Sequence, residues 1–189
     1  MTELAWATLG TPVGPLSAGC SDAGVREVRF GRAPRHPAGA PPFQPPPAGA
    51  RELCEEALRQ LAGYFAGQRL RFDVPVDWSQ TSRLQRQVLS MLLESVGYGD
   101  TVSYGALARR VGYRGLGASP PARVIGRIMG SNPVPVIVPC HRVVAADGLG
   151  GYSGGAGPEV KRWLLTLEGA LPPTLGWDAT GLGAQSPSG

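Results

Sequence analysis

The chain has 189 residues, of which 28 are Gly and 19 are Pro, a share at the edge of the range in which low-complexity disorder is suspected. Hydrophobic residues make up 42% of the chain and charged residues 17%, which is enough apolar material for a folded core and argues against disorder throughout. The length suits one domain of ordinary size or two small ones.

The sequence shows no sign of a membrane span or of export. No apolar run approaches the roughly 18 residues that a membrane-spanning helix requires, so we expect no membrane partner. Residues 1–10 hold neither a basic stretch nor a long apolar one, so no secretory signal is evident. Cys20, Cys54 and Cys140 lack C-x-x-C spacing, which argues against a disulfide scaffold and a structural zinc site. We therefore expect a reducing, cytoplasmic location and neither a metal nor a cofactor.

Positive charge gathers in one part of the chain. The formal net charge is +4, and the segment 81–146 holds eight arginines against two acids, Glu94 and Asp100. A local arginine excess is the electrostatic footprint of a nucleic-acid partner. A solvated surface in an arginine-rich protein gives the same count, so charge alone leaves both interpretations open.

Residues 1–78 predict an α/β domain with a small antiparallel sheet and a helix. Three short apolar runs bounded by turn residues predict strands at 4–9, 16–20 and 25–30. Seven prolines without periodicity make 33–50 a Pro-rich loop. Apolar residues recurring every four positions then predict an amphipathic helix over 51–66.

Residues 79–170 predict a mainly helical domain. Its first helices are expected at 82–95, 103–111 and 119–129. Ser82-x-x-Gln85 is a capping box, and Ser119 followed by Pro120 predicts the start of the third helix, which Gly130 would end. The second and third helices can form a helix-turn-helix, in which the latter enters a DNA groove. Any small helical domain gives this pattern, and the loop 112–118 is longer than the usual turn.

The last part of the chain predicts a buried segment, a loop and a final helix. Val134–Val138 is almost wholly apolar but contains a proline, which favours a buried extended segment. The Gly-rich loop 148–157 leads to Pro158, which opens a helix that Gly169 ends. Residues 171–189 lack any pattern and predict a flexible tail.

Cys140 and His141 stand side by side directly after the buried segment. A thiolate is a nucleophile, and a cysteine with a histidine base is a recurrent design for covalent catalysis. Neighbouring residues on a strand face opposite sides, so the pair can cooperate only if the chain turns there or if a water relays the proton. A third group must hold the imidazole, and Glu168 is a candidate. The simpler interpretation is a buried, inert cysteine and a surface acid.

The run Asn132-Pro-Val-Pro-Val-Ile-Val-Pro-Cys-His-Arg-Val-Val resembles the active-site signature of the O6-alkylguanine-DNA alkyltransferases, or methylated-DNA–protein-cysteine methyltransferases. The resemblance continues through Gly151-Tyr-Ser-Gly-Gly, Lys161-Arg-Trp-Leu-Leu, Leu167-Glu-Gly and, upstream, Arg86-Gln-Val-Leu, Thr101-Val-Ser-Tyr-Gly-Ala-Leu-Ala and Ala122-Arg-Val-Ile-Gly. It is dense from about residue 80 to 170 and loose over 1–78.

This resemblance implies direct-reversal DNA repair. The methyl or alkyl group of O6-alkylguanine, and of O4-alkylthymine, would pass to Cys140 in a single turnover, after minor-groove binding and base flipping. The implied partner is double-stranded DNA, the protein would act as a monomer, and no cofactor is needed. Proton donation is required because a guanine anion is a poor leaving group.

The resemblance also implies a role for each matched residue. Cys140 would accept the alkyl group, His141 would deprotonate it through a water, and Glu168 would orient His141. Asn132 would form a hydrogen bond near the cysteine, and Tyr104 would supply a hydrogen bond or proton to the guanine.

The DNA contact and the base pocket follow in the same way. Arg123 resembles the family's arginine finger, which fills the space of the extruded nucleotide, and Ala122 and Gly126 would face DNA beside it. The pocket would be lined by Met129, Val143, Tyr152, Ser153 and Gly154. Val124 and Arg127 are bulkier than is usual at the DNA face, which bears on groove fit but not on the chemistry.

Two other functions remain open at this point. The chain can be a damage-binding or regulatory module that uses the helix pair without chemistry, or a cysteine hydrolase built on Cys140 and His141. The presence of Cys140 together with Tyr104 and Arg123 favours alkyl transfer over the first alternative. Nothing in the sequence indicates the carbonyl substrate and oxyanion hole that the second requires.

Overall fold

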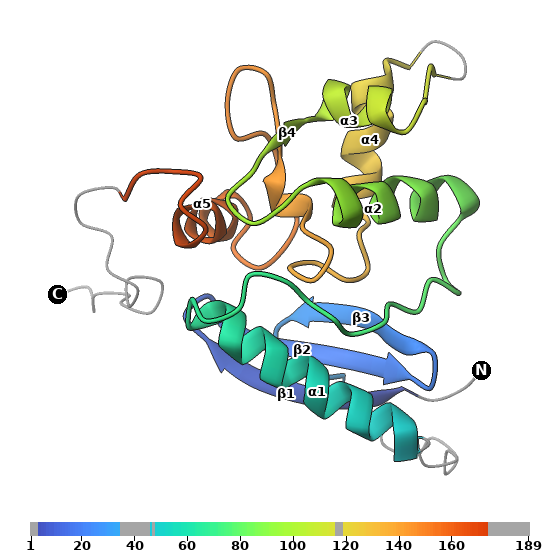
Figure 1. The fold of residues 1–189 in the computed structure, drawn as a ribbon, viewed down its shortest axis with the longest axis vertical. Coiled ribbons are helices and arrows are strands. Elements are labelled where there is room, and N and C mark those ends of the chain that lie inside the picture. The colour runs from blue at the N-terminus through green and yellow to red at the C-terminus, as the bar shows by residue number, and fades with distance from the viewer. Residues whose placement is uncertain (1–3, 35–45, 47, 116–118, 174–189) are drawn as a thin grey trace, which may run out of the picture.

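The computed structural model describes residues 4–34, 46, 48–115 and 119–173. In chain order its elements are β1 (Ala5–Thr11), β2 (Gly14–Ser21), β3 (Gly24–Phe30), α1 (Ala48–Phe65), α2 (Arg83–Ser95), β4 (Val102–Ser103), α3 (Tyr104–Arg110), α4 (Pro121–Gly130), a 3-10 turn η1 (Cys140–Arg142), β5 (Val143–Val144) and α5 (Pro158–Leu167). The predicted fold class, an α/β part followed by a mainly helical part, is confirmed (Figure 1). Most of the Pro-rich loop and of the predicted tail lies outside the described residues.

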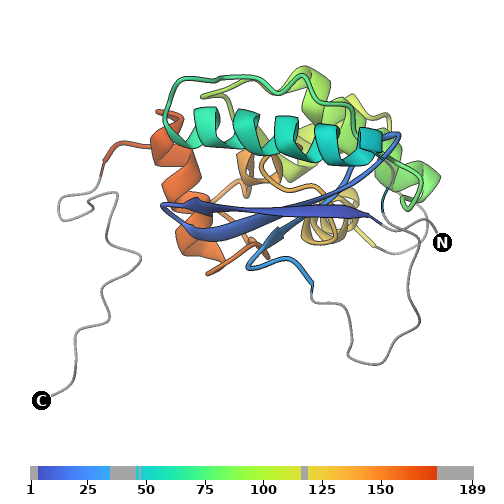
Figure 2. The same cartoon turned by 90° about the horizontal axis from the view of Figure 1, so that it is seen from below.

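The first part of the chain is a meander of three antiparallel strands in the order β1-β2-β3. Helix α1 lies along this sheet (Figure 2). Its buried stripe includes Cys54, whose Sγ donates to the carbonyl oxygens of Ala5 at 3.3 Å and Ala18 at 3.1 Å. The apolar residues whose spacing of four predicted the helix therefore lie mainly on the face that covers β1 and β2.

The helical part begins with two side-chain caps that the sequence predicts. Ser82 Oγ accepts from the amide of Gln85 at 3.2 Å, and Ser103 Oγ accepts from that of Ala106 at 3.1 Å. The capping box is only half formed, because the side chain of Gln85 does not reach back to Ser82. Its Nε2 donates instead to the Ser131 carbonyl oxygen at 2.9 Å. That bond ties the first turn of α2 to the end of α4.

Two details of the helical part differ from the prediction. Helix α4 begins at Pro121, and its N-cap residue is Pro120, not the predicted Ser119. At the other end, Gly130 is still part of the helix, and Ser131 is the C-cap. The segment Val134–Val138 is buried as expected, but it turns instead of running extended. Pro135 pairs with Val138, and Val136 has a φ of 73°, a strained value for a β-branched residue. Prolines on both sides of the run prevent a continuous strand.

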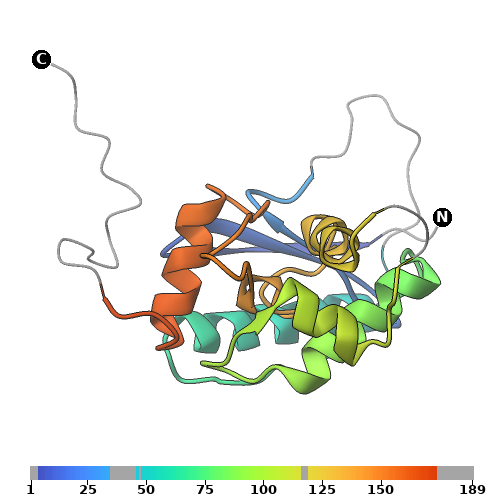
Figure 3. The ribbon, with the colours of Figure 1, turned by 90° about the horizontal axis from the view of Figure 1, so that it is seen from above.

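The two parts share one continuous apolar core. Strand β3 joins them through its backbone, because Val28 N donates to Pro133 O at 2.8 Å. Within the first part, Val25 N donates to Pro75 O at 2.8 Å, which fixes the segment that leads into the helical part. The division at residue 78 remains a prediction. Helices α3 and α4 lie side by side at the end of the molecule remote from the sheet (Figures 1 and 3). None of the helices in the described part of the chain has the length and hydropathy that a membrane span needs.

Gly24 gives a direct test of the contact between β3 and the segment that leads into the helical part. It has a φ of +138°, and a Cβ there would lie 2.3 Å from Pro75 O. Gly24→Ala should therefore lower the free energy of unfolding by at least about 3 kcal/mol, because the strained backbone adds to a clash with another main chain. The measurement is urea denaturation.

Gly14→Ala is the matched control, because Gly14 has a φ of +96° but nothing within 4 Å of its Cβ position. We expect it to cost about 1–2 kcal/mol, the backbone cost alone. Equal losses in the two variants would contradict the close approach of β3 to Pro75.

Candidate active site

Cys140 begins the turn η1, which connects the buried segment to β5. The chain therefore turns between Cys140 and His141, which meets one of the two conditions for their cooperation that the sequence sets. Cys140 is buried, yet it lines two cavities, of about 430 and 440 Å³. A nucleophile at the floor of a cavity can reach a small substrate while bulk water is kept away.

The imidazole of His141 is fully buried and held by Glu168, which follows the last turn of α5. His141 Nε2 lies 2.8 Å from Glu168 Oε1. Burial lowers the pKa of His141, and Glu168 only partly offsets this shift. The neutral ring with its proton on Nε2 leaves a lone pair on Nδ1, which has no hydrogen-bond partner among the described residues. That atom is free to accept a proton.

The carboxylate of Glu168 also binds Arg142, which the sequence analysis did not single out. Arg142 Nε donates to Oε2 at 2.9 Å and Nη2 to Oε1 at 3.0 Å, while Nη1 donates to Val96 O at 2.7 Å. Burial by itself would raise the pKa of Glu168, but hydrogen bonds and charge from His141 and Arg142 lower it to about 2. The carboxylate is therefore ionised although it is buried.

Lys161 is a second functional candidate that sequence reasoning missed. It is fully buried on α5, and Nζ donates to Val143 O at 2.6 Å and to Gly151 O at 3.2 Å. Burial lowers its pKa to about 8, against the opposing charge of Cys140. The signal was present, because Lys161 is the only lysine of the chain and follows Val160 on the inward side of a predicted helix.

The thiol of Cys140 is subject to opposing effects. Burial raises its pKa, and the nearby Asn132, Lys161 and Tyr152 side chains act in the opposite direction. The Tyr152 hydroxyl is buried without a hydrogen-bond partner in the described part of the chain, and its proximity to Cys140 adds to the effect of burial in raising its own pKa. These polar groups favour the thiolate in a site where burial opposes charge.

The cavity of about 430 Å³ opens between α3, α4 and the loop after β5. It is lined by Tyr104, Ala122, Gly126, Met129, Gly130, Cys140, Gly151, Tyr152 and Ser153. Its volume is typical of a site for a small molecule and accommodates a purine base. The backbone of Gly150 approaches the ring of Tyr104 so closely that a Cβ there would lie 3.0 Å away, so this wall depends on glycine.

The remaining predicted residues lie around this cavity. Asn132 holds the turn before Cys140, donating to Val138 O at 2.9 Å and accepting from Val134 N at 3.0 Å. Gly154 and Asn132 line the cavity of about 440 Å³, which shares Cys140, Tyr152 and Ser153 with the first. Val143 is buried and lines neither cavity.

Arg123 is exposed on α4, and it follows Ala122, which lines the first cavity. Ser153 Oγ donates to Gly130 O at 3.0 Å, which joins the end of α4 to the loop after β5. Within the described ranges, no three His, Cys, Asp or Glu side chains gather closely enough to hold a metal ion.

The comparisons with known proteins agree with this geometry. Residues 83–170 match the model of the 6-O-methylguanine DNA methyltransferase DNA-binding domain. The methylated-DNA–protein-cysteine methyltransferase of Mus musculus is 34% identical over 95% of this chain and 89% of its own length. The relative of that name from Methanopyrus kandleri is 45% identical over 67% of this chain and 89% of its own length.

A solved structure extends the likeness to three dimensions. The Mycobacterium tuberculosis OGT, crystallised in complex with DNA, matches with a TM-score of 0.68 and 36% identity over 87% of this chain and 93% of that one. Fold and site together define a protein with a buried cysteine that lines a cavity beside two helices of a DNA-binding domain. The chain belongs to the methylated-DNA–protein-cysteine methyltransferase family.

The buried carboxylate predicts an acid-sensitive fold. The pKa of Glu168 falls from an ordinary 4.5 to about 2 on folding, so its contribution is fully present above the unfolded value and is lost as the pH falls through the folded value. We expect about 3 kcal/mol of stability to disappear between pH 5 and pH 2, measured by urea denaturation at each pH. Glu168→Gln should flatten the curve in this window, and parallel curves would contradict the assignment.

Proposed function

We propose that this chain repairs DNA by moving the alkyl group of O6-alkylguanine to Cys140 Sγ. The observation that carries the proposal is the position of Cys140, at the floor of a purine-sized cavity and beside a buried His141 with an available Nδ1. The family, whose members are named for transfer of a methyl group from DNA to a cysteine, supports the same reaction.

The proposed reaction is a displacement at carbon. His141 Nδ1 takes the thiol proton through a bridging water, and Glu168 stabilises the imidazolium that forms. The Cys140 thiolate attacks the alkyl carbon, a C–S bond forms, and the C–O6 bond breaks with its electron pair going to the guanine. Tyr104, whose pKa is raised chiefly by burial, donates a proton or hydrogen bond to that base.

The proposed product is a thioether, which limits each molecule to one turnover. Neither C–S bond of a thioether is displaced by water under mild conditions, so no step returns the free thiol. All side chains of the proposed site come from one chain, which supports a monomer as the active form.

Access to the base requires that it leave the duplex, because O6 of a stacked guanine is out of reach. We propose that α4 enters the minor groove with the small residues Ala122 and Gly126 facing DNA. Arg123, which is exposed and follows the cavity-lining Ala122, would then occupy the gap that the extruded base leaves. The DNA complex of the Mycobacterium tuberculosis relative supports double-stranded DNA as the partner.

Within the proposed pocket, Met129 packs beside the base and Tyr152 forms a wall next to Cys140. Ser153 lies near the guanine oxygen, and Gly154 keeps the adjoining cavity open. The backbone carbonyls of Cys140 and Val143 accept from the exocyclic amine. That of Val143 already accepts from Lys161 at 2.6 Å, so it would use its second lone pair.

The cavity also accommodates a pyrimidine, which supports O4-alkylthymine as a second substrate. The alkylated oxygen of thymine, like that of guanine, is exocyclic on a six-membered ring.

Intact-mass measurement tests the proposed function. After incubation with a duplex that contains O6-methylguanine, the protein should gain one methyl group on Cys140, and Cys140→Ser should gain none. A parallel duplex with O4-methylthymine tests the second substrate. Unchanged mass with tight binding would favour a damage-binding module instead, and repeated turnover would exclude the single-use mechanism.

Arg123 should matter for duplex DNA and not for the chemistry. Arg123→Ala is expected to slow repair of duplex O6-methylguanine roughly 10- to 100-fold, because the cost of unstacking the base is no longer offset. Its rate with free O6-benzylguanine should stay within about twofold of the parent. Arg51→Ala, an exposed arginine on α1 and not on the proposed DNA face, is the control. Equal losses on the two substrates would refute the role in flipping.

A further inference from the structure

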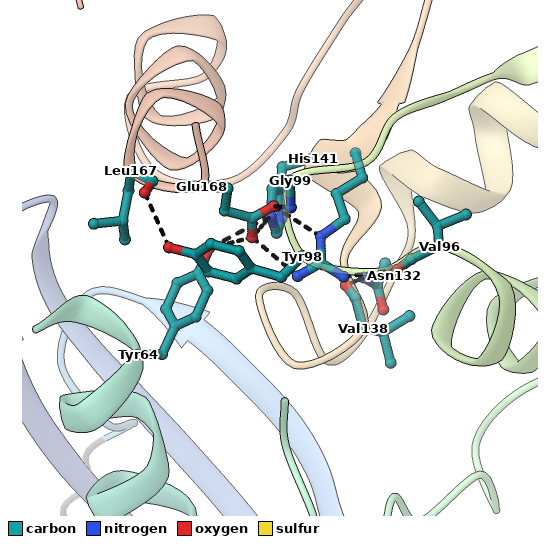
Figure 4. A network of polar contacts seen from close by, with 10 residues as sticks. Tyr64, Val96, Tyr98, Gly99, Asn132, Val138, His141, Leu167 and Glu168 are labelled. Atoms are coloured by element: carbon teal, nitrogen blue, oxygen red, sulfur yellow. Dashed lines mark hydrogen bonds and ion pairs between the residues drawn. The ribbon is translucent and has the colours of Figure 1, made fainter. Parts of the chain in front are cut away.

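Tyr64 is a residue that the proposed mechanism does not use, although it touches the catalytic candidates. It lies on α1, in the α/β part of the chain, and is fully buried. Its hydroxyl donates to Glu168 Oε1 at 2.7 Å and lies 3.5 Å from His141 Nε2 (Figure 4). In the described residues before position 79, no other side chain forms a hydrogen bond to His141 or Glu168.

The hydroxyl completes the set of donors around one oxygen. Glu168 Oε1 accepts from Tyr64, from His141 Nε2 and from Arg142 Nη2 at 2.7, 2.8 and 3.0 Å. An ionised carboxylate accepts only, so each of these groups must present a proton to it. The proton of His141 is therefore fixed on Nε2, and the lone pair is fixed on Nδ1.

The ring of Tyr64 is itself held rigidly, so the direction of its hydroxyl is set in advance. Phe65 and Tyr98 pack edge-on against it with centroids at 5.4 and 6.1 Å, and Phe72 packs at 5.4 Å in a tilted arrangement. Burial and the negative charge of Glu168 raise the pKa of Tyr64 well above its ordinary value, so the hydroxyl keeps its proton at neutral pH.

We infer that Tyr64 is a positioning residue for alkyl transfer, which holds the Glu168 carboxylate so that His141 keeps its Nδ1 lone pair available for the Cys140 proton. This inference rests on the proposed function for its substrate, but not for its effect on the thiol. It gives the α/β part of the chain a defined role: one hydroxyl from α1 acts on the reactive cysteine through Glu168 and His141.

The titratable and charged groups around Glu168 differ from those around Cys140. Glu168 is faced by Tyr64 from α1, by Tyr98 from the segment after α2, and by His141 and Arg142 from η1. Cys140 is faced by Lys161 from α5 and by Tyr104 and Tyr152. Removal of the Tyr64 hydroxyl changes none of the groups around the thiol directly, so any effect on the thiol must pass through Glu168 and His141.

Tyr64→Phe tests the inference because it removes one oxygen and keeps the aromatic packing. The pH dependence of Cys140 alkylation by iodoacetamide, followed by peptide mass, should move to higher pH by about 0.5–1 unit. The rate with free O6-benzylguanine should fall about three- to tenfold, because part of the free energy of one hydrogen bond is lost from the positioning of His141. Duplex repair should fall by the same factor, because the defect lies in the thiol and not in DNA binding.

Tyr98→Phe is the matched control. It also removes a hydroxyl from the same aromatic cluster, but that hydroxyl donates to the Leu167 carbonyl oxygen at 2.9 Å and not to the carboxylate. We expect its pH dependence to equal that of the parent protein. A thermal unfolding curve for each variant shows that the compared proteins are folded.

A double-mutant cycle separates positioning from general stability. In a Glu168→Gln background, Tyr64→Phe should lower the reaction rate little further, because Tyr64 acts on His141 only through Glu168. Additive losses, an unchanged pH dependence in Tyr64→Phe, or a faster reaction would each overturn the inference. Failure of the proposed function would appear differently, as a parent protein that reacts with iodoacetamide but gains no alkyl group from O6-alkylguanine.

Discussion

The structure depends on one buried carboxylate. Glu168 lies at the end of α5 and accepts hydrogen bonds from Tyr64 on α1 and from His141 and Arg142 on η1. Removal of one of these hydrogen bonds to the buried carboxylate is expected to cost about 1.5–3 kcal/mol. The same atoms therefore hold three distant segments together and fix the tautomer of the imidazole beside Cys140. Stability and reactivity are coupled at this point.

Burial of the cysteine creates a second constraint. An apolar setting protects a thiolate from water but raises the pKa of the thiol, so charge must be supplied from within the protein. Lys161 supplies it while donating to two backbone carbonyl oxygens, those of Val143 and Gly151, that shape the cavity. One side chain thus connects the electrostatics of the nucleophile to the walls of the pocket, which explains a fully buried lysine.

Local sequence signals predicted the elements well and their connections less well. The side-chain caps at Ser82 and Ser103 follow from residue type at the start of a helix, and both predictions were correct. The buried face of α1 follows from the spacing of its apolar residues and was also predicted. The turn at Val136 was missed although the neighbouring prolines and Asn132 are local. The parallel pair β4-β5 depends on contacts between segments about 40 residues apart, which no local pattern encodes. Arg142 and Lys161 were missed for the same reason, because a charged residue is assigned to the surface until its buried partner is known.

The sequence by itself determined the family and the fold class, because the run around Cys140 is specific and most of the predicted helices carry their own start and stop. Only the tertiary structure decided what surrounds Cys140. The chain turns between Cys140 and His141, and the carboxylate that orients the imidazole is held by a tyrosine 104 positions earlier in the chain. Hydrogen bonds of this range form only when the core closes, since packing and not sequence proximity brings their partners together.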